Sequence, residues 1–391
     1  MLILRTSGVD ESLDRYADLD LIRYNAGFLG EVVAHSDWTE NAASVLMKIG
    51  GRTTSNHDHA DAGSFQIYYK GILAGDTGFY DTYGSAHHRD YHQATIAHNS
   101  IVIYRNGKLV QQSPTNSEPS SYETWMSNSY VTATVTGYSE AYKDADKTSP
   151  IYSYIAGDIT PAYVGNFKRA DRRMLAVFDT DNPDVPMYFF VYDGMQAKNT
   201  SDDITFLLHT TIKPEINGNV VTTSMGGGKL VLQSLMGGDK ITAIGGSDNN
   251  YVVNGSQVAT QNGERDGYWG RVEITSTAST VSDTLLNVMY VTTNTNKNFY
   301  EAKSFKTDKV VGSIIGNTAA VFVDSSERCS EQFSFTATTS EESVNYYVSG
   351  VAAGNWTVSV GSTTLTVSAT EEGGMLYFTA PSGEITLTPI K

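Results

Sequence analysis

The sequence contains almost no cysteine: Cys329 is the only one in 391 residues, which excludes an intrachain disulfide framework. The redox compartment stays open, because many secreted bacterial β-proteins also lack disulfides. Charged residues are scarce at 18%, and their balance is acidic, with a net charge of -16 and a pI near 4.8. We therefore expect no general nucleic-acid binding, and a polyanionic ligand would need a locally basic groove.

Long apolar runs and a leader sequence are also missing. No stretch of about 18 apolar residues occurs, so we expect no membrane-spanning helix. The opening residues, MLILRTSGVDESLD, lack the basic region and the small-residue cleavage site of a signal peptide. Either the protein stays inside the cell, or this chain is a piece whose true N-terminus lies upstream.

The residues that are abundant favour β-structure. The chain has 35 glycines, 24 tyrosines and 40% hydrophobic residues, which is turn-rich and sufficient for two or three domains. Short strand-like runs with alternating polarity recur, and an Asn-Gly pair predicts a hairpin turn. These runs include SVLMKIGG, SFQIYYKGILAGD, HNSIVIYRNGKLV, RRMLAVFD, PMYFFVYDGM, ITFLLHTTI and LLNVMYVTT.

This pattern predicts an all-β protein: a large antiparallel β-sandwich followed by a small C-terminal β domain, with little helix. We divide the chain into a helical or irregular connecting segment at 1–40, the sandwich at 41–300 and the small domain at 301–391. A linker-like stretch near residue 300 separates the last two.

Histidine is concentrated in one place. Six of the eight histidines lie between positions 57 and 98. In an extended segment, residues i and i+2 project to the same face, so His57 and His59 can reach one cavity while Asp58 points away. Asp76 ends the next strand and His98 heads another. Two imidazoles and a carboxylate with one open position are a natural zinc set, although spacing alone does not fix the partners.

The histidines also allow interpretations other than this zinc site. A single His-x-His in a β-rich chain is also found in ordinary surface or hydrogen-bonded structure. We expect His87, His88 and His92 to be exposed loop residues, and His35 and His209 to be structural. A cupin-like metal site would need a glutamate near the pair, where this chain has Asp61 instead.

Two motifs together resemble a known family. NHDHADAGSFQIYYKG with LAGDTG, and YGSAHHRDYHQATIAHNS, are similar to the heparinase II/III-like polysaccharide lyases, on the heparinase II side of that family. YVSGVAAGNWTVSV resembles the family's C-terminal β domain. The resemblance implies cleavage of uronic-acid-containing polysaccharides, such as heparin or heparan sulfate, by β-elimination.

The resemblance also implies roles for individual residues. His57 matches the catalytic histidine, and His59, Asp76 and His98 match the ligands of one mainly structural zinc ion. Asn56 matches a position that meets the substrate. We add Tyr80, Tyr83 and Arg89 as candidate substrate contacts, and we consider the basic run at 168–173 as a further source of positive charge.

The family's full-length members carry an α/α toroid before the sandwich, and residues 1–40 are too short to form it. We therefore expect a truncated lyase, inactive without a helical domain supplied upstream or by another chain, and secreted or periplasmic in its full-length form. The expected partners are an acidic polysaccharide, that helical domain and, as an open possibility, a second copy of the chain. The alternative is a non-catalytic, zinc-stabilised carbohydrate-binding β-sandwich.

Overall fold

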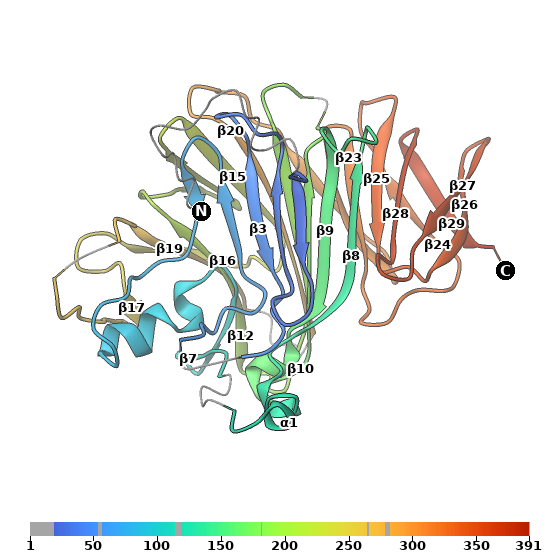
Figure 1. The fold of residues 1–391 in the computed structure, drawn as a ribbon. Helices are drawn as coiled ribbons and strands as arrows, with labels where there is room; N and C mark the ends of the chain where they lie inside the picture. Colours follow the sequence, from blue (N-terminus) through green and yellow to red (C-terminus); the bar gives the residue numbers. More distant parts are fainter. Residues whose placement is uncertain are drawn as a thin grey trace.

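The computed structural model describes residues 19–53, 57–113, 119–180, 182–263, 266–277 and 282–390. Nearly all regular structure in these ranges is β-strand (Figure 1), so the all-β prediction is confirmed. The helical segments are single turns: α1 (Tyr122–Trp125), a π-helical turn at His88–His92, and 3-10 turns at Thr95–Ala97, Asn128–Tyr130 and Thr160–Tyr163. None of the described helices is long and apolar enough to cross a membrane.

The sandwich consists of three main sheets, all antiparallel. The first sheet has the order β1-β2-β3-β4-β5, with bounds Ile22–Asn25, Glu31–His35, Ser44–Lys48, Phe65–Tyr68 and Ile72–Ala74. The central sheet has the order β13-β14-β15-β20-β11-β10-β9-β8. Its bounds in that order are Glu215–Asn217, Val220–Met225, Gly228–Met236, Ser282–Thr293, Met187–Ala197, Phe167–Val177, Pro150–Asp158 and Thr134–Tyr142.

The third sheet has the order β16-β19-β12-β6-β7, with bounds Lys240–Gly245, Gly270–Ser276, Asp202–Thr210, Ile101–Arg105 and Lys108–Val110. A two-stranded hairpin, β17 (Val252–Val253) and β18 (Ser256–Gln257), lies apart from it. The predicted Asn-Gly turn joins β6 to β7, with positive φ at Asn106 (51°) and Gly107 (73°). This is the backbone geometry that favours Asn-Gly in two-residue hairpins.

The predicted connecting segment at 1–40 differs from the structure in its described part. Residues 22–25 and 31–35 are neither helical nor irregular: they form β1 and β2, and β2 pairs with β3. The turn between them, AGFLG, is apolar and glycine-rich, so the short alternation of buried Val32 and Ala34 with partly exposed Glu31 and Val33 is hard to recognise in the sequence. The first sheet therefore begins before the proposed boundary at 41.

Strands β9, β10 and β11 of the central sheet are buried on both faces, unlike its edge strands β13 and β8. Along β10, Met174 and Ala176 enter one core, shared with the first and third sheets, while Leu175 and Val177 enter a second core. Because side chains alternate along a strand, the two cores lie on opposite faces of the sheet. In the sequence, such a strand is a continuous run of apolar residues rather than an alternation of apolar and polar residues.

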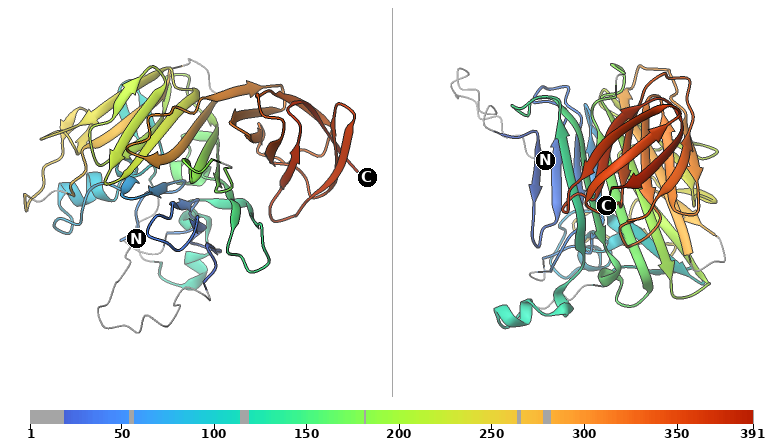
Figure 2. Two further views of the ribbon diagram at one scale, coloured as in Figure 1. Left: turned by 90° about the horizontal axis from the view of Figure 1, so that it is seen from above. Right: turned by 90° about the vertical axis from the view of Figure 1, so that its right-hand side faces the viewer.

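The second core joins the sandwich to the C-terminal domain, which Figure 2 shows as a lobe at one end of the molecule. Tyr192 of β11 stacks on Phe322 with ring centroids 5.2 Å apart, and Arg173 donates a 2.6 Å hydrogen bond to the Val323 carbonyl. A separate core around Trp356 lies within the domain. The described residues of the C-terminal domain form two sheets. The first has the order β21-β22-β23-β25-β28, with bounds Ala302–Lys306, Val310–Ile315, Thr318–Val323, Val344–Ser349 and Met375–Ala380. The second has the order β24-β29-β26-β27, with bounds Phe333–Ala337, Gly383–Pro389, Gly354–Val360 and Thr363–Ala369.

A buried ion pair connects the central sheet to the loops that precede β4 and β6. Arg172 of β10 pairs with Asp193 of β11 through bonds of 2.6 and 2.9 Å, and both side chains are fully buried. The same guanidinium donates to the carbonyls of Gly63 at 2.5 Å and Asn99 at 3.3 Å. Burial raises the pKa of the Asp193 carboxyl even beside Arg172. The pair is therefore costly to desolvate, and its main effect is to fix the two loops.

A second buried contact joins β12 to the same region. The Asn99 side chain donates to the Phe65 carbonyl at 2.8 Å and accepts the backbone N–H of His209 at 2.7 Å. The His209 ring lies 2.9 Å from the Ile96 carbonyl through Nε2. His209 is thus a structural residue, as predicted.

We predict that Asp193→Asn destabilises the protein by about 3–5 kcal/mol, because it leaves the Arg172 guanidinium buried without a counter-charge. Urea unfolding followed by circular dichroism measures this loss. Lys309→Gln, which breaks the exposed 2.8 Å pair between Lys309 and Glu331, is the matched control and should change little. Equal effects of the two substitutions would contradict the role assigned to the buried pair.

We also predict that His209 makes the fold acid-sensitive. Burial, followed by the charge of Arg271, lowers the pKa of His209 to about 3 from the ordinary 6.5. Below pH 6.5 the His209 imidazole is protonated in the unfolded chain but not in the folded chain. The free energy of unfolding therefore falls by about 1.4 kcal/mol per pH unit from this residue. Chemical unfolding between pH 7 and pH 5 measures the slope, which His209→Gln should reduce; parallel slopes would disprove the contribution.

Candidate functional site

The histidine-rich region is assembled from loops, whereas His-x-His was expected on an extended segment. His57 and His59 lie in the connection between β3 and β4. Asp76 follows the end of β5 by two residues, and His98 follows the 3-10 turn before β6. Asp58 and His59 both belong to the lining of one pocket.

Several hydrogen bonds and one ion pair hold the loop that follows His59. Gln112 accepts the Ala62 N–H at 3.0 Å and donates to the Ala62 carbonyl at 2.8 Å, and the Ser100 hydroxyl donates to the same carbonyl at 2.7 Å. Lys48 of β3 pairs with Asp61 at 2.8 Å. With Arg172 holding Gly63, these bonds fix the backbone immediately C-terminal to His59.

The three predicted metal ligands lie close together. His98 Nδ1 is 3.1 Å from Asp76 Oδ1, and the ring centroids of His59 and His98 are 5.1 Å apart. Gln66 of β4 donates to the other Asp76 oxygen at 2.9 Å. The segments that carry these three residues therefore lie close together, while their role as metal ligands stays a prediction.

The surroundings shift the pKa values of the three side chains in this cluster in different directions. Burial opposes ionisation of Asp76, but the neighbouring imidazole of His98 outweighs it and lowers the pKa of Asp76. Burial likewise disfavours the charged form of His98, and Asp76 overcomes this and raises the pKa of His98. Burial, followed by the charge on His98, lowers the pKa of His59 to about 4. His59 is therefore neutral at pH 7, the form in which an imidazole binds a metal.

The donor chemistry fits a zinc ion, although the described atoms do not form a closed site. His98 Nδ1 faces Asp76 Oδ1, whereas the buried Nε2 of His98 has no hydrogen-bond partner within the described ranges. Buried polar atoms of this kind normally have a partner, so an ion is a natural candidate. Within the described ranges, however, no group of three or more His, Cys, Asp or Glu side chains is arranged to hold a metal. The zinc ion stays a prediction.

The predicted catalytic histidine lies on the open side of this cluster. His57 is exposed, and its ring centroid is 5.9 Å from Tyr83 and 6.4 Å from Tyr80. The two tyrosines are 56% and 53% exposed. An imidazole between two accessible phenol rings can meet a ligand, unlike the enclosed His98.

The remaining residues considered as substrate contacts are Asn56, Arg89 and the basic run at 168–173. Asn56 lies outside the described residues. Arg89 is exposed but pairs with its neighbour Asp90 at 2.7 Å. The basic run at 168–173 is not a surface patch: Arg172 and Arg173 are buried in the two cores. Alternation along β10 sends successive arginines to opposite faces of a sheet that is covered on both sides.

The prediction that His87 and His88 are exposed loop residues is wrong. Both are buried, and the His87 ring contacts Tyr251 with centroids 4.5 Å apart. His92 is partly buried, and its ring lies 4.6 Å from that of His59. Burial, followed by the charge on His59, lowers the pKa of His92 to about 3.

Residues that lie far along the sequence, and that were not predicted to belong to the site, pack over these histidines. Asp266 accepts the backbone N–H of Gly78 and lies 3.1 Å from the Tyr251 hydroxyl. Asp81 accepts the N–H groups of Gln261 at 2.8 Å and Asn262 at 3.1 Å. Asp266 belongs to an unremarkable polar segment, QNGERDG, and local sequence does not show that it bonds to a loop 188 positions earlier.

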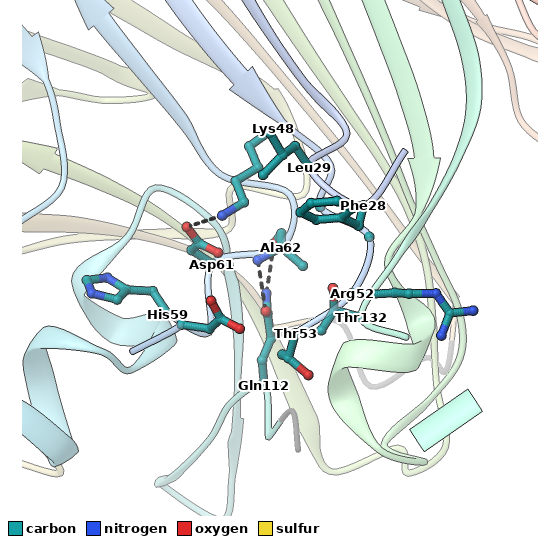
Figure 3. A pocket seen from close by; sticks show the side chains of 13 residues that line it. Phe28, Leu29, Lys48, Arg52, Thr53, His59, Asp61, Ala62, Gln112 and Thr132 are labelled. Carbon is teal, nitrogen blue, oxygen red and sulfur yellow. Dashed lines mark hydrogen bonds and ion pairs between the residues drawn. The ribbon is translucent and has the colours of Figure 1, made fainter. Parts of the chain in front are cut away.

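A polar pocket adjoins the cluster (Figure 3). His59 and Asp61 lie at one end of it, and Phe28 and Arg52 lie at the other. Gln112 and Ala62 form part of its lining, joined by the two hydrogen bonds described above. The pocket thus extends from the histidine cluster toward the loop that carries Arg52.

Comparison with solved structures shows the fold. A crystal structure of a mutant of the heparan sulfate lyase HepC from Pedobacter heparinus has a TM-score of 0.51 at 15% identity, over 77% of this chain and 42% of that chain. A second structure, of HepC from the same organism, has a TM-score of 0.48 at 17% identity, over 75% of this chain and 41% of that one. The chain therefore spans less than half the length of the lyase it matches.

Two family models match the sequence, while no curated protein does. Residues 304–389 match the heparinase II C-terminal domain. Residues 30–299, which include every metal ligand and catalytic candidate, match the heparinase II/III-like C-terminal model. That second match extends over more than half of the chain, and the chain belongs to the heparinase II/III-like family.

Proposed function

We propose that this chain is the β-rich part of a polysaccharide lyase that cleaves uronate-containing glycans, of the heparin or heparan sulfate type, by β-elimination. The observation that carries the proposal is the placement of His57: it is exposed between Tyr80 and Tyr83, while its neighbour His59 faces the His98–Asp76 pair. A reactive imidazole is thereby separated from a buried cluster that holds its backbone.

The reaction needs a base for the C5 proton beside the uronate carboxylate. We assign this step to His57, because it is an exposed imidazole beside Tyr80 and Tyr83, and histidine is the side chain that most often acts as a general base. As the proton leaves C5, the C4–C5 double bond forms and the C4–O4 bond breaks. An acid then protonates O4. Tyr80 and Tyr83 are placed to contact the sugar beside His57, and Asn56 is a further proposed contact.

The residues that would hold zinc are His59, Asp76 and His98. Bound there, the ion would cross-link the β3–β4 connection to the two ends of the β5–β6 connection, rather than supply chemistry on the sugar. The residues of the chain then keep His57 in position: Gln112, Ser100 and Arg172 fix the backbone just beyond His59. Small errors in the placement of a base are costly, so this support matters for the rate.

We also propose that elimination requires a helical domain, upstream or on another chain, that completes the cleft. The alternative function is carbohydrate binding without catalysis, which the exposed tyrosines beside His57 would also permit. The two functions differ in one respect: binding survives the loss of the His57 imidazole, whereas elimination does not.

For the metal, we predict about one zinc per chain, lost together with thermal stability on chelation, since site formation is coupled to folding. His98→Ala should abolish zinc binding and lower the melting temperature. His57→Ala is the control and should retain both the zinc and the melting temperature. Elemental analysis and thermal unfolding measure the two effects. A melting temperature that chelator leaves unchanged would contradict the structural role of the metal.

For catalysis, we predict that His57→Ala lowers β-elimination roughly 10²–10⁴-fold, because it removes the base. Ultraviolet absorbance of the unsaturated product from heparan sulfate measures the rate, in a full-length form that carries the helical domain. Lys309→Gln, on the C-terminal domain, is the control. If that full-length form makes no unsaturated product from any uronate polymer, the lyase proposal fails and binding alone remains.

A further inference from the structure

Phe28, at the end of the pocket away from His59 in Figure 3, belongs to a cluster of three aromatic side chains that extends beyond the pocket lining. Trp125 of α1 contacts Phe28 edge-on, with centroids 5.5 Å apart, and Tyr122, with centroids 6.0 Å apart. Phe28 is 46% exposed and Tyr122 is 67% exposed. We name Phe28, Tyr122, Trp125 and the adjacent Arg52 the aromatic platform.

The platform is fastened by polar bonds between three loops. Arg52 Nη1 donates to the carbonyls of Trp125 and Ser127, both at 2.9 Å. The Trp125 indole N–H donates to the Thr53 carbonyl at 2.8 Å, and the Arg52 backbone N–H donates to the Phe28 carbonyl at 3.3 Å. The rings are therefore held in place before any ligand arrives, which lowers the entropic cost of binding.

The platform is continuous with the histidine cluster. One pocket is lined by Phe28 and Arg52 at one end and by Asp58 and His59 at the other. Asp58 is the neighbour of His57 in the sequence. A chain-like ligand that reaches His57 can thus extend along the pocket to the platform.

We propose that the aromatic platform is a subsite that binds a uronate-containing glycan at a distance from the bond that is cleaved. The proposal rests on the lyase or glycan-binding function assigned above. The apolar face of a sugar ring can stack on Tyr122 and Phe28, since aromatic rings offer large, rigid contact area. The guanidinium of Arg52 supplies the positive charge that a uronate carboxylate needs.

The charges favour a polymer with few or no sulfates. Lys48 is paired with Asp61, and Arg89 with Asp90. Nη1 of Arg52 already serves two carbonyls. Lys48 and Arg89 are therefore compensated by carboxylates, whereas the carbonyls bonded to Arg52 are neutral and leave its single charge for a uronate carboxylate; the chain as a whole carries a net charge of -16. Stacking, rather than ion pairing with sulfate, supplies the binding energy of this subsite.

The test measures binding of the purified chain to alginate, an unsulfated uronate polymer, and to heparin by affinity electrophoresis at several salt concentrations. Tyr122→Ala and Phe28→Ala should each weaken alginate binding roughly three- to tenfold. Phe299→Ala removes an equally exposed ring, 54% accessible, outside the platform and should bind as the unaltered chain does. Heparin should bind no more tightly than alginate at moderate salt.

Several results would overturn the subsite. They are unchanged alginate binding by Tyr122→Ala, no alginate binding by the unaltered chain, or tighter heparin binding that falls steeply with salt. A change of oligomeric state in Tyr122→Ala without a change in binding would assign the platform to a second copy instead. Failure of the lyase function is separable, because alginate binding is measured on the chain by itself, whereas elimination is measured in the full-length form.

Discussion

The buried guanidinium of Arg172 is the contact on which the rest of the site depends. It is held by Asp193 within the central sheet and donates to the carbonyls of Gly63 and Asn99. Those carbonyls belong to the two loops that carry His59 and His98. A scaffold strand thus reaches two loops through one planar group with several donors, which a lysine could not reproduce.

Around that contact the site divides into an enclosed part and an open part. Asp76 and His98 are paired within the enclosed part, where burial keeps His59 neutral. His57, Tyr80 and Tyr83 form the open part. Placing a reactive group on the rim of a rigid, buried cluster combines access with fixed geometry, and catalysis by proton transfer requires both.

The sequence predicted the parts of this molecule that local pattern controls. Alternation and turn residues predicted the strands and the Asn106–Gly107 hairpin, and the motifs brought His59, Asp76 and His98 together. It did not predict the burial of His87 or the inward direction of Arg172. Both depend on covering layers that come from distant segments, and charged or polar residues next to one another look like surface until those layers are known.

The cover supplied by Asp266 has a consequence for biosynthesis. Its bond to Gly78 spans 188 positions of sequence, so the histidine-bearing loops leave the ribosome long before the strands and loops that close over them. Contacts of such range form late, after a large entropic cost of chain closure. The nascent chain therefore passes through a stage in which its histidine-bearing loops are not yet covered by the later segments.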